Sequence, residues 1–350
     1  KTTSSYQLFC KILFYICTMK ILVLEKKPGI PKYKQIVSAV EKAILAGLLK
    51  KGDKLPSLNT IKNEHKLSRD TVLSAFNELK NRGIIHSIVG KGYYVSTEHI
   101  VVEQKIFLLF DELNSFKEDL YNSFLQNLGD NIQVDIFFHH FNNDVFTKLI
   151  NDNIGNYSSY VIMPANLEGT ENTIQNLPKE KVYILDQMHN GLSQYSGIYQ
   201  NFEKDIFNGL QNGFSKIKKY TKLVLLFPKE KQPQGLLNGF NLFCKKNNLK
   251  NEVISSLENR ILKKSELYII LDDKNLIRII KKIKQGKLIL AKDIGVISYN
   301  ETMLKEIVEG GITTISTDFN LMGQNLAKMV LNNQRIKIEN PSGIKLRKSV

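Results

Sequence analysis

The amino-acid sequence predicts an α/β protein that begins with a winged helix-turn-helix and continues into a larger domain built from parallel β-sheets. Three observations predict this class. Three helical segments and a short hairpin follow one another between residues 31 and 96. Short apolar strands then alternate with helices over about 240 residues. The length of 350 residues suggests two or three domains.

The composition fits a protein with a hydrophobic core and a polyanionic partner. Hydrophobic residues make up 42% of the chain, and the net charge is +15. A basic chain is compatible with nucleic-acid binding, but the solvated faces of any lysine-rich protein give the same charge. The cysteines, Cys10, Cys17 and Cys244, have no metal-ligand spacing. Their odd number argues against a disulfide framework and fits a reducing cytoplasm.

Residues 1–18 are expected to be an extension, non-native or disordered, outside the folded protein. The apolar run at residues 8–17 is interrupted by Lys11 and is too short to cross a membrane. It also lacks the small-residue cleavage site of a signal peptide. Met19, followed by "KILVLEKKPGIPKYKQI", resembles a natural start. No other segment is expected to cross a membrane.

Three helices are predicted in the first domain, which we place at residues 19–96. Apolar residues recur at helical spacing in "PKYKQIVSAVEKAILAGLL". Pro56 then precedes Ser57, which can cap the helix "LNTIKNEHK". Ser68 can cap a third helix, in which positions i, i+3, i+4 and i+7 counted from Val72 are apolar. Gly83 ends that helix.

The second and third helices have the spacing of a helix-turn-helix, with Arg69 and Thr71 in the first turn of the recognition helix. That turn enters the major groove end-on. An arginine there can donate two hydrogen bonds to guanine, while hydroxyls and free helical N–H groups can hold phosphate. An ordinary helical hairpin gives the same helix pattern, so the next segment decides between the two interpretations.

A hairpin follows directly, because "IIHSIV" and "YYVS" are typical of strands and "GKG" joins them. Gly90 and Gly92 flank Lys91, and glycine allows positive φ and close approach of another molecule. A lysine at a hairpin tip beside a recognition helix can contact phosphate or the minor groove. Helix-turn-helix plus hairpin predicts a winged helix that binds double-stranded operator DNA.

The segments "GDKLPS", "LSRDTV" and "GKGYYV", in this order, resemble the DNA-binding domain of GntR-family transcription regulators. The resemblance covers about residues 31–96. It implies DNA contacts from Ser57, Ser68, Arg69, Thr71, Gly90, Lys91 and Gly92. Leu58 and Asn59 stand where the family usually has a Glu-Arg pair, and Leu73 stands where it often has arginine. Asn59 can still bond a phosphate or an adenine edge, so it is included among the DNA contacts.

Residues 97–105 look like a linker, and strands and helices alternate in residues 106–350. The predicted strands include "IFLLF", "IQVDIFF", "SYVIMP", "KVYILD", "KLVLLFP", "LYIILDD" and "IGVISY". Ligands of parallel sheets bind beyond the carboxyl ends of the strands. Polar residues follow four of these strands: Asp111, Asp186, Gln187, Asp272, Asp273 and Asn300. A carboxylate at one strand end often only caps the next helix, but four such ends favour a polar cleft.

The C-terminal segment "IGVISYNETMLKEIVEGGITTISTDFNLMGQNLAKMVLN" is similar to the effector domain of LacI/GalR-type regulators, as is "NGF" after "LVLLFP". The resemblance implies a periplasmic-binding-protein-like fold of two lobes with a hinge, which binds an effector and dimerises. Asp186 matches an acidic residue that binds sugar hydroxyls, and Phe116 could stack on a ligand. Leu236, Asn300 and Thr317 replace residues that the family commonly uses for sugars.

These features predict a ligand-responsive transcription regulator, a homodimer and a repressor, whose effector is a sugar or sugar derivative. One alternative is a DNA-binding regulator whose second domain only dimerises. Another is a solute-binding protein for transport, which leaves the winged helix unexplained. We expect no enzyme, since P-loop, GxGxxG, HExxH and nucleophile-elbow motifs do not occur. No catalytic residue, cofactor or metal site is therefore predicted, and His139 and His140 are expected on a surface loop.

Overall fold

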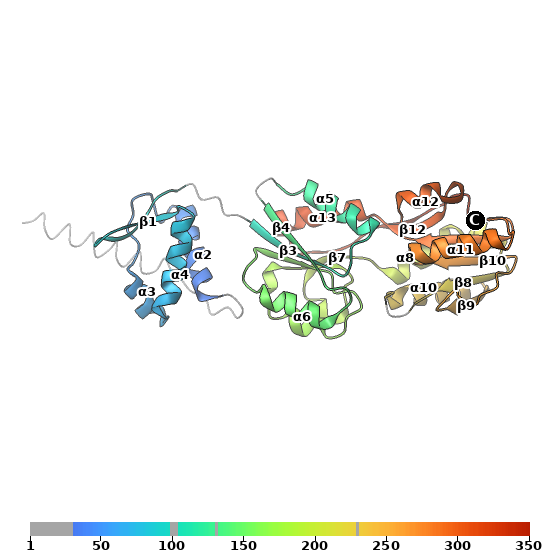
Figure 1. Cartoon of the computed structure of the whole chain (residues 1–350), viewed down its shortest axis with the longest axis horizontal. Coiled ribbons are helices and arrows are strands. Elements are labelled where there is room, and N and C mark those ends of the chain that lie inside the picture. Colours follow the sequence, from blue (N-terminus) through green and yellow to red (C-terminus); the bar gives the residue numbers. More distant parts are fainter. Residues whose placement is uncertain (1–30, 99–103, 130–131, 229–230) are drawn as a thin grey trace, which may run out of the picture. The chain divides into compact units, whose positions relative to one another are not determined.

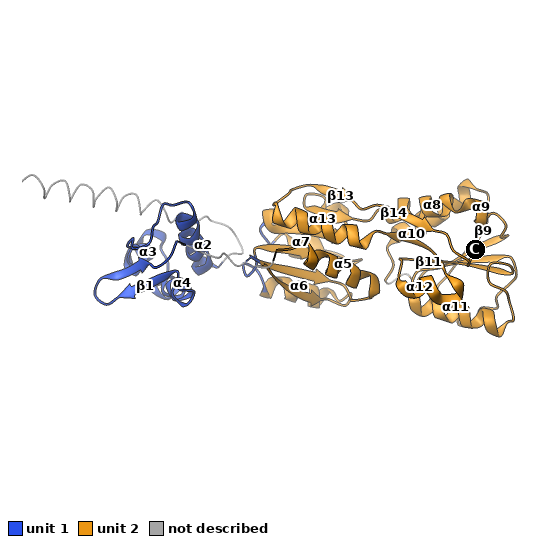
Figure 2. Ribbon diagram, turned by 90° about the horizontal axis from the view of Figure 1, so that it is seen from above, with its two compact units in different colours: residues 1–104, 153–157, 176–178 blue, residues 105–152, 158–175, 179–350 orange. Residues whose placement is uncertain are grey.

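The computed structural model describes residues 31–98, 104–129, 132–228 and 231–350 (Figure 1). The predicted extension at residues 1–18 and most of the predicted linker lie outside the described residues. The chain divides into two compact units (Figure 2). Unit 1 comprises residues 1–104 with two short segments, 153–157 and 176–178, and unit 2 comprises the rest.

Unit 1 contains a winged helix-turn-helix. Its elements are α2 (Lys32–Leu45), α3 (Leu58–His65), α4 (Arg69–Asn81), β1 (Ile85–Ile88) and β2 (Gly92–Val95). The helices form because each has one apolar face to bury. In α4 that face is the predicted set, Val72, Ala75, Phe76 and Leu79, all fully buried. Strands β1 and β2 pair antiparallel, with Ile85 opposite Val95. The ring of Tyr93 meets that of Phe76 edge-on, at a centroid distance of 4.7 Å.

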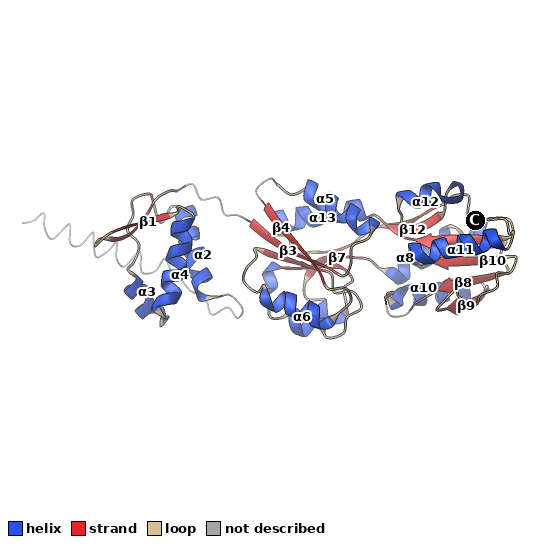
Figure 3. Cartoon of the chain, in the orientation of Figure 1, coloured by secondary structure: helices blue, strands red, loops and turns tan. Residues whose placement is uncertain are grey.

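Unit 2 has two lobes, each built on a six-stranded sheet (Figure 3). The strand order in lobe 1 is β13-β7-β6-β5-β3-β4. These strands are β3 (Gln104–Phe110), β4 (Ile132–Phe138), β5 (Ser159–Ile162), β6 (Val182–Asp186), β7 (Ser196–Tyr199) and β13 (Lys337–Glu339). Its helices are α5 (Ser115–Gln126), α6 (Asn143–Asp152), α7 (Thr170–Ile174), η1 (Lys179–Lys181), η2 (Asn190–Leu192) and α13 (Phe319–Leu331). Helices α5 and α13 cover one face of the sheet, and α6 lies on the other (Figure 1).

The strand order in lobe 2 is β14-β12-β11-β10-β8-β9, and only β14 is antiparallel to its neighbour among the pairs described. The strands are β8 (Lys222–Leu226), β9 (Lys250–Ile254), β10 (Glu266–Ile270), β11 (Ile294–Tyr299), β12 (Thr313–Thr317) and β14 (Ser342–Lys345). The helices are α8 (Phe202–Asn212), α9 (Phe214–Ile217), α10 (Gln234–Lys246), α11 (Asp273–Gln285), α12 (Met303–Ile307) and η3 (Val308–Gly310). Successive residues of β8 enter opposite cores: Leu223 and Leu225 meet the α8–α10 layer, whereas Val224 and Leu226 meet α11.

The chain passes between the lobes three times, after β7, after β12 and after β13. Asn340 joins all three crossings. Its side-chain amide donates hydrogen bonds to Thr317 Oγ1 and to the backbone oxygen of Asp318, both at 2.8 Å. Its backbone N–H donates to the oxygen of Tyr199, also at 2.8 Å. This two-lobed α/β unit, which follows a winged helix-turn-helix in the chain, confirms the predicted fold class.

Candidate DNA-binding surface and ligand site

The same cap opens both helices of the helix-turn-helix. Ser57 Oγ accepts a hydrogen bond from the backbone N–H of Thr60, and Ser68 Oγ accepts one from that of Thr71, each at 3.1 Å. In both caps the serine and threonine hydroxyls are also 2.7 Å apart. These bonds satisfy helix-end donors that would otherwise lack a partner. The serines therefore set where α3 and α4 begin, and with them the position of Arg69.

The turn between α3 and α4 depends on one left-handed residue. Lys66 has φ 52°, and its backbone N–H bonds to the oxygen of Lys62. After it, Ser68 starts α4, and Arg69 lies exposed in the first turn beside the exposed Asp70. Asn59 is exposed in the first turn of α3. Both predicted base-reading side chains thus face solvent.

The hairpin tip has the conformation that the glycines predict. Gly90 has φ +74° and Gly92 has φ +112°, a region that other residues enter only with strain. Lys91 between them is exposed, as is Val89. Sequence reasoning missed Lys54. Its backbone forms an antiparallel β-bridge with that of Tyr94, and its Nζ atom lies 6.0 Å from the centroid of the Tyr94 ring. This exposed lysine adds a positive charge beside the hairpin.

In unit 2, the polar residues at the carboxyl ends of β3 and β6 lie in one buried group. Asp111 pairs with Lys117 from the first turns of α5, and both side chains are more than nine-tenths buried. Asp186 accepts a hydrogen bond from the side-chain amide of Gln200. Burial raises the pKa of Asp186 to about 6, although the nearby Lys117 acts in the opposite direction. Asp186 also has φ 72°, which aspartate tolerates better than most residues.

Lobe 2 adds two further groups to this site. Tyr299 is 3% exposed, and its hydroxyl has no hydrogen-bond partner. Burial raises its pKa, and the nearby carboxylates of Asp205 and Asp186 add to the rise. Asp205 belongs to the first turn of α8. Its Oδ2 atom has no partner, and burial together with Glu339 raises its pKa to about 7.

Proximity thus connects seven buried groups from both lobes, which we call the polar cluster: Asp111, Lys117, His139, Asp186, Gln200, Asp205 and Tyr299. Sequence reasoning missed Lys117, His139, Gln200, Asp205 and Tyr299 as members.

His139 is buried, contrary to the surface loop expected for it, whereas His140 is exposed. The ring of His139 contacts the edge of Phe146, and its Nε2 atom is 3.1 Å from the backbone oxygen of Met163. Burial lowers its pKa, which favours the neutral ring. Nε2 carries the ring proton, because the oxygen of Met163 can only accept. Nδ1 is therefore an acceptor, and it has no partner.

The remaining predicted ligand residues have different surroundings. Asp272 caps α11, accepting bonds from the backbone and side-chain N–H groups of Asn275, both at 2.8 Å. Asp273 pairs at 2.9 Å with the buried ammonium of Lys305. Phe116 packs on Phe319, at a centroid distance of 4.8 Å.

Asn300 and Gln187 stay closer to the polar cluster, because they directly follow Tyr299 and Asp186 in the sequence. Asn300 is buried, has φ 62° and has an Oδ1 atom without a partner. Gln187 is 9% exposed.

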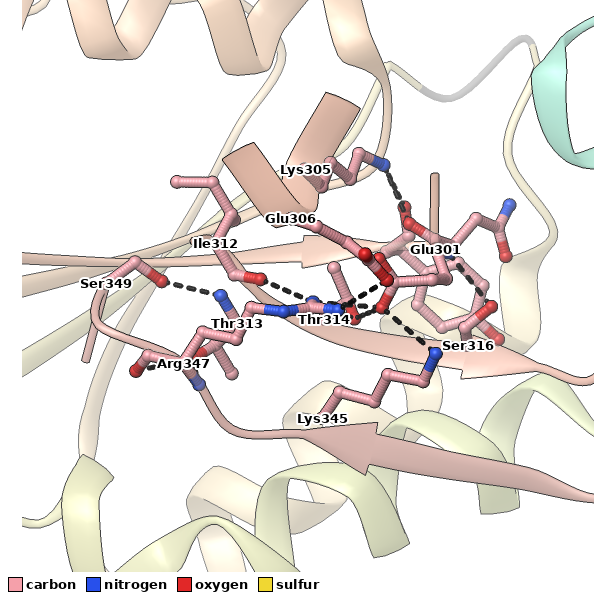
Figure 4. Close-up of polar contacts among 12 residues, drawn as sticks. Glu301, Lys305, Glu306, Ile312, Thr313, Thr314, Ser316, Lys345, Arg347 and Ser349 are labelled. Carbon is pink, nitrogen blue, oxygen red and sulfur yellow. Dashed lines mark hydrogen bonds and ion pairs between the residues drawn. The ribbon is translucent and has the colours of Figure 1, made fainter. Parts of the chain in front are cut away.

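Behind Asn300, a polar network fixes the end of β11 (Figure 4). Lys305 Nζ donates to the backbone oxygens of Tyr299 and Asn300, at 2.9 and 2.7 Å. Glu301 accepts from Thr314 and pairs at 3.0 Å with Arg347. These contacts connect the strand end to β12 and to the C-terminal segment.

The lobes also meet away from the polar cluster. Lys231 of lobe 2 lies 3.1 Å from the carboxylate of Glu112 in lobe 1, and 4.9 Å from the centroid of the Phe141 ring. The side chains of Lys231 and Glu112 are 57% and 37% exposed. Such an exposed ion pair stabilises by less than about 1 kcal/mol, so it can open at little cost.

A winged helix-turn-helix followed by a two-lobed α/β unit is the architecture of a DNA-binding transcription regulator. Residues 32–95 match the family described as "Bacterial regulatory proteins, gntR family". The transcriptional repressor YtrA of Bacillus subtilis is 30% identical over 95 residues, which are 27% of this chain and 73% of YtrA. The chain belongs to the GntR family of bacterial regulatory proteins.

A second relative is the mannosyl-D-glycerate transport/metabolism system repressor MngR of Escherichia coli. It is 39% identical over 90 residues, which are 26% of this chain and 35% of MngR. The chain thus spans about a third of that relative's length.

Among solved structures, the dimeric lac repressor with an 11-residue C-terminal deletion is similar to this chain. The TM-score is 0.59 at 14% identity, over 70% of this chain and 98% of that one. This similarity establishes the LacI-like, periplasmic-binding-protein-like fold of unit 2. No helix in the described ranges is both long and apolar enough to cross a membrane.

Proposed function

We propose that this regulator is a repressor that binds operator DNA as a homodimer and changes its operator affinity when a small metabolite binds between the lobes. One observation carries the proposal. A single chain combines a recognition helix whose first turn is exposed with a buried group of polar atoms, several of which have no partner. Buried polar atoms without partners cost free energy, and a ligand that bonds to them recovers it.

In this proposal Arg69 and Asn59 read base edges, and Lys91 at the hairpin tip holds phosphate. Ser57, Ser68 and Thr71 fix the helix starts and supply hydroxyls near the backbone of the DNA. Gly90 and Gly92 let the hairpin approach it closely. Phosphate contacts position the protein, whereas base contacts specify the sequence.

Ligand binding is assigned to the polar cluster together with Asn300 and Gln187. Asp272, Asp273 and Phe116, which the sequence also predicts as effector contacts, already have partners in Asn275, Lys305 and Phe319, so the ligand is not assigned to them. The sugar or sugar derivative expected from the sequence agrees with the mannosyl-D-glycerate system that MngR represses. A ligand shifts operator occupancy only if it binds one arrangement of the lobes better than the other.

Dimerisation is supported by an apolar face on α12. Met303, Leu304 and Ile307 are 83%, 50% and 77% exposed on this short helix. Clustered exposure of large apolar side chains is typical of a protein interface. The similar lac repressor is dimeric. A two-fold dimer would place its winged helices on half-sites about 34–36 Å apart, or a multiple of that spacing.

The DNA-binding part is tested by selecting operator sequences from random duplexes with the full chain. The Arg69→Ala variant is expected to lose ~1–3 kcal/mol of specific binding, because a bidentate contact to one base is removed. Lys80→Ala is the control, since Lys80 is exposed in the last turn of the same helix. If Arg69→Ala binds the selected operator as tightly as the wild type, the recognition helix has been placed wrongly.

The ligand-binding part is tested by thermal shift of the full chain against sugars, sugar acids, sugar phosphates and nucleosides. A ligand at 100 times its Kd adds ~2.7 kcal/mol, which raises the Tm by several degrees. Each hit is then titrated into the operator complex. Release from DNA supports repression with induction. A screen without any hit instead favours a regulator whose second domain only dimerises.

A further inference from the structure

The ligand that fits the polar cluster is a cation, and we infer that the effector carries a protonated amino group that pairs with Asp186. This inference rests on the proposed function, because it specifies the ligand of that same site. It is narrower than a sugar or sugar derivative, since it requires a positive charge. It follows from the charges, the partners and the unsatisfied atoms of the cluster.

The charges within the cluster do not balance. Lys117 supplies the one ammonium among its seven members, and this ammonium is bound to Asp111. Asp186 is left with the neutral amide of Gln200 as its hydrogen-bond partner. Asp205 lies near Glu339, and the cation beside them, Lys204, pairs with Glu339. One ion pair therefore leaves two further buried carboxyl groups without a bound cation.

Burying an unpaired carboxylate is costly, and a protein can reduce this cost by binding a proton or a cation. Burial raises the pKa of Asp186 and of Asp205, so the charged form of each carboxyl would gain stability from a cation beside it. The hydroxyl of Tyr299 has no hydrogen-bond partner, and burial together with both carboxylates raises its pKa. An ammonium group near this hydroxyl would interact with one carboxylate from each lobe, and it would therefore favour closure of the two lobes around it.

The atoms without hydrogen-bond partners around the cluster also favour a ligand that donates hydrogen bonds. They are Gln200 Oε1, Asn300 Oδ1, Asp205 Oδ2, His139 Nδ1 and the hydroxyl of Tyr299. Gln200 Oε1 and Asn300 Oδ1 can only accept, as can His139 Nδ1 when the ring is protonated at Nε2, and Asp205 Oδ2 accepts when its carboxyl is ionised. An ammonium group has three donors and no acceptor, so it matches this set. A phosphate or carboxylate ligand brings only acceptors and a negative charge, and is disfavoured on both counts.

A neutral polyol also offers donors, so the test must separate charge from hydrogen bonding. Full-length protein is titrated with two matched series of probes. One is glucosamine, glucose and glucuronate, and the other is 1,4-diaminobutane, 1,4-butanediol and succinate. Binding is followed by the shift in Tm and by calorimetry. We expect the cationic member of at least one series to bind about 10- to 100-fold more tightly than its neutral partner.

The Asp186→Asn variant removes the charge and keeps the size of the side chain, so it should abolish the preference for the cation. Asp144→Asn is the matched control, because Asp144 is an exposed carboxylate on α6.

The pH dependence of binding to the wild type is an independent test. Affinity for the cation should begin to fall below about pH 7, as Asp205 gains a proton, and should fall about tenfold per pH unit below pH 6, as Asp186 gains one. Asp111, Lys117 and Tyr299 are the other titratable groups that act on Asp186.

The outcomes separate this inference from the function on which it rests. Tightest binding of a cation, lost in Asp186→Asn and at low pH, supports both. Tightest binding of a neutral or anionic member overturns the cationic effector and leaves a ligand-responsive regulator in place. If no member of either series binds, the inference is wrong. If the wider metabolite screen is also negative, the ligand-responsive function falls with it.

Discussion

In the winged helix, the side chains of Asn59, Arg69 and Lys91 face solvent, whereas in the polar cluster those of Asp111 and Asp186 are more than nine-tenths buried. The difference decides what each charge can do. An exposed charge contributes little to folding and is free to meet DNA. A buried charge influences the free energy of unfolding and ligand binding together. Mutations of exposed charges in the winged helix should therefore change DNA binding with little effect on the free energy of unfolding. Mutations in the polar cluster should change ligand binding and the free energy of unfolding together.

The largest expected effect comes from breaking the buried ion pair. Lys117→Met leaves Asp111 without its cation and should destabilise unit 2 by ~3–5 kcal/mol. The corresponding fall in Tm is about 10 °C, measurable by calorimetry. Lys231→Met is the matched control, because it removes a lysine from the exposed pair with Glu112 and should cost less than ~1 kcal/mol. Equal losses in the two variants would remove the contrast between buried and exposed charge.

Asp186→Asn, in contrast to Lys117→Met, should increase the free energy of unfolding at high pH. The folded pKa of Asp186, about 6, lies above its unfolded value, so the folded state holds this proton more tightly. Its contribution to stability is present below the unfolded pKa and is lost as pH rises from about 4 to about 6. At pH 8 the variant should be more stable by ~2–3 kcal/mol, while binding no cationic ligand. Urea unfolding at pH 5 and pH 8 measures this; a variant no more stable at pH 8 than the wild type contradicts it.

In the winged helix, Ser68→Ala should cost ~1 kcal/mol of stability, because the backbone N–H of Thr71 loses its cap. Hydrogen exchange in the first turn of α4 locates the loss. Ser74→Ala is the control, since Ser74 is exposed within the same helix and alanine favours helices. If exchange rises equally in both variants, the cap does not hold the start of α4.

The smallest expected effect is that of Lys91→Gln, which should leave the Tm unchanged. Affinity for random-sequence duplex DNA should weaken, and the slope of log K against log salt should fall by about 1, as one phosphate contact is lost. Lys328→Gln, an exposed lysine on α13, is the control. A slope identical in the two variants would show that the hairpin tip does not contact phosphate.

The winged helix was the most predictable part, because its signals are local. Caps at Ser57 and Ser68, the apolar face of α4 and the glycines around Lys91 each act within a few residues. The long apolar strands of unit 2 were also predicted. Strands β7, β9, β13 and β14 were missed, because they are short and carry polar residues that only their neighbours in the sheet explain.

The polar cluster was predicted only in part, since its members come together through tertiary structure. Lys117 had a usable signal, because it lies three residues before Leu120 and seven before Phe124 on the buried face of α5. Gln200 and Asp205 had none, because they lie at the crossing into lobe 2, which the sequence does not mark. For Asp272, the simpler expectation of a helix cap describes its contacts.

The three crossings between the lobes have a consequence for synthesis. Lobe 1 needs α13 and β13 from near the end of the chain, and lobe 2 needs β14, which comes later still. The winged helix, in contrast, is a single segment that ends at Val95. It can fold as soon as it leaves the ribosome, while neither lobe can be completed until almost the whole chain has been translated. Nascent or prematurely terminated chains would then hold a folded winged helix beside exposed, incomplete sheets, and without α12 they would lack the apolar face that the proposed dimer uses.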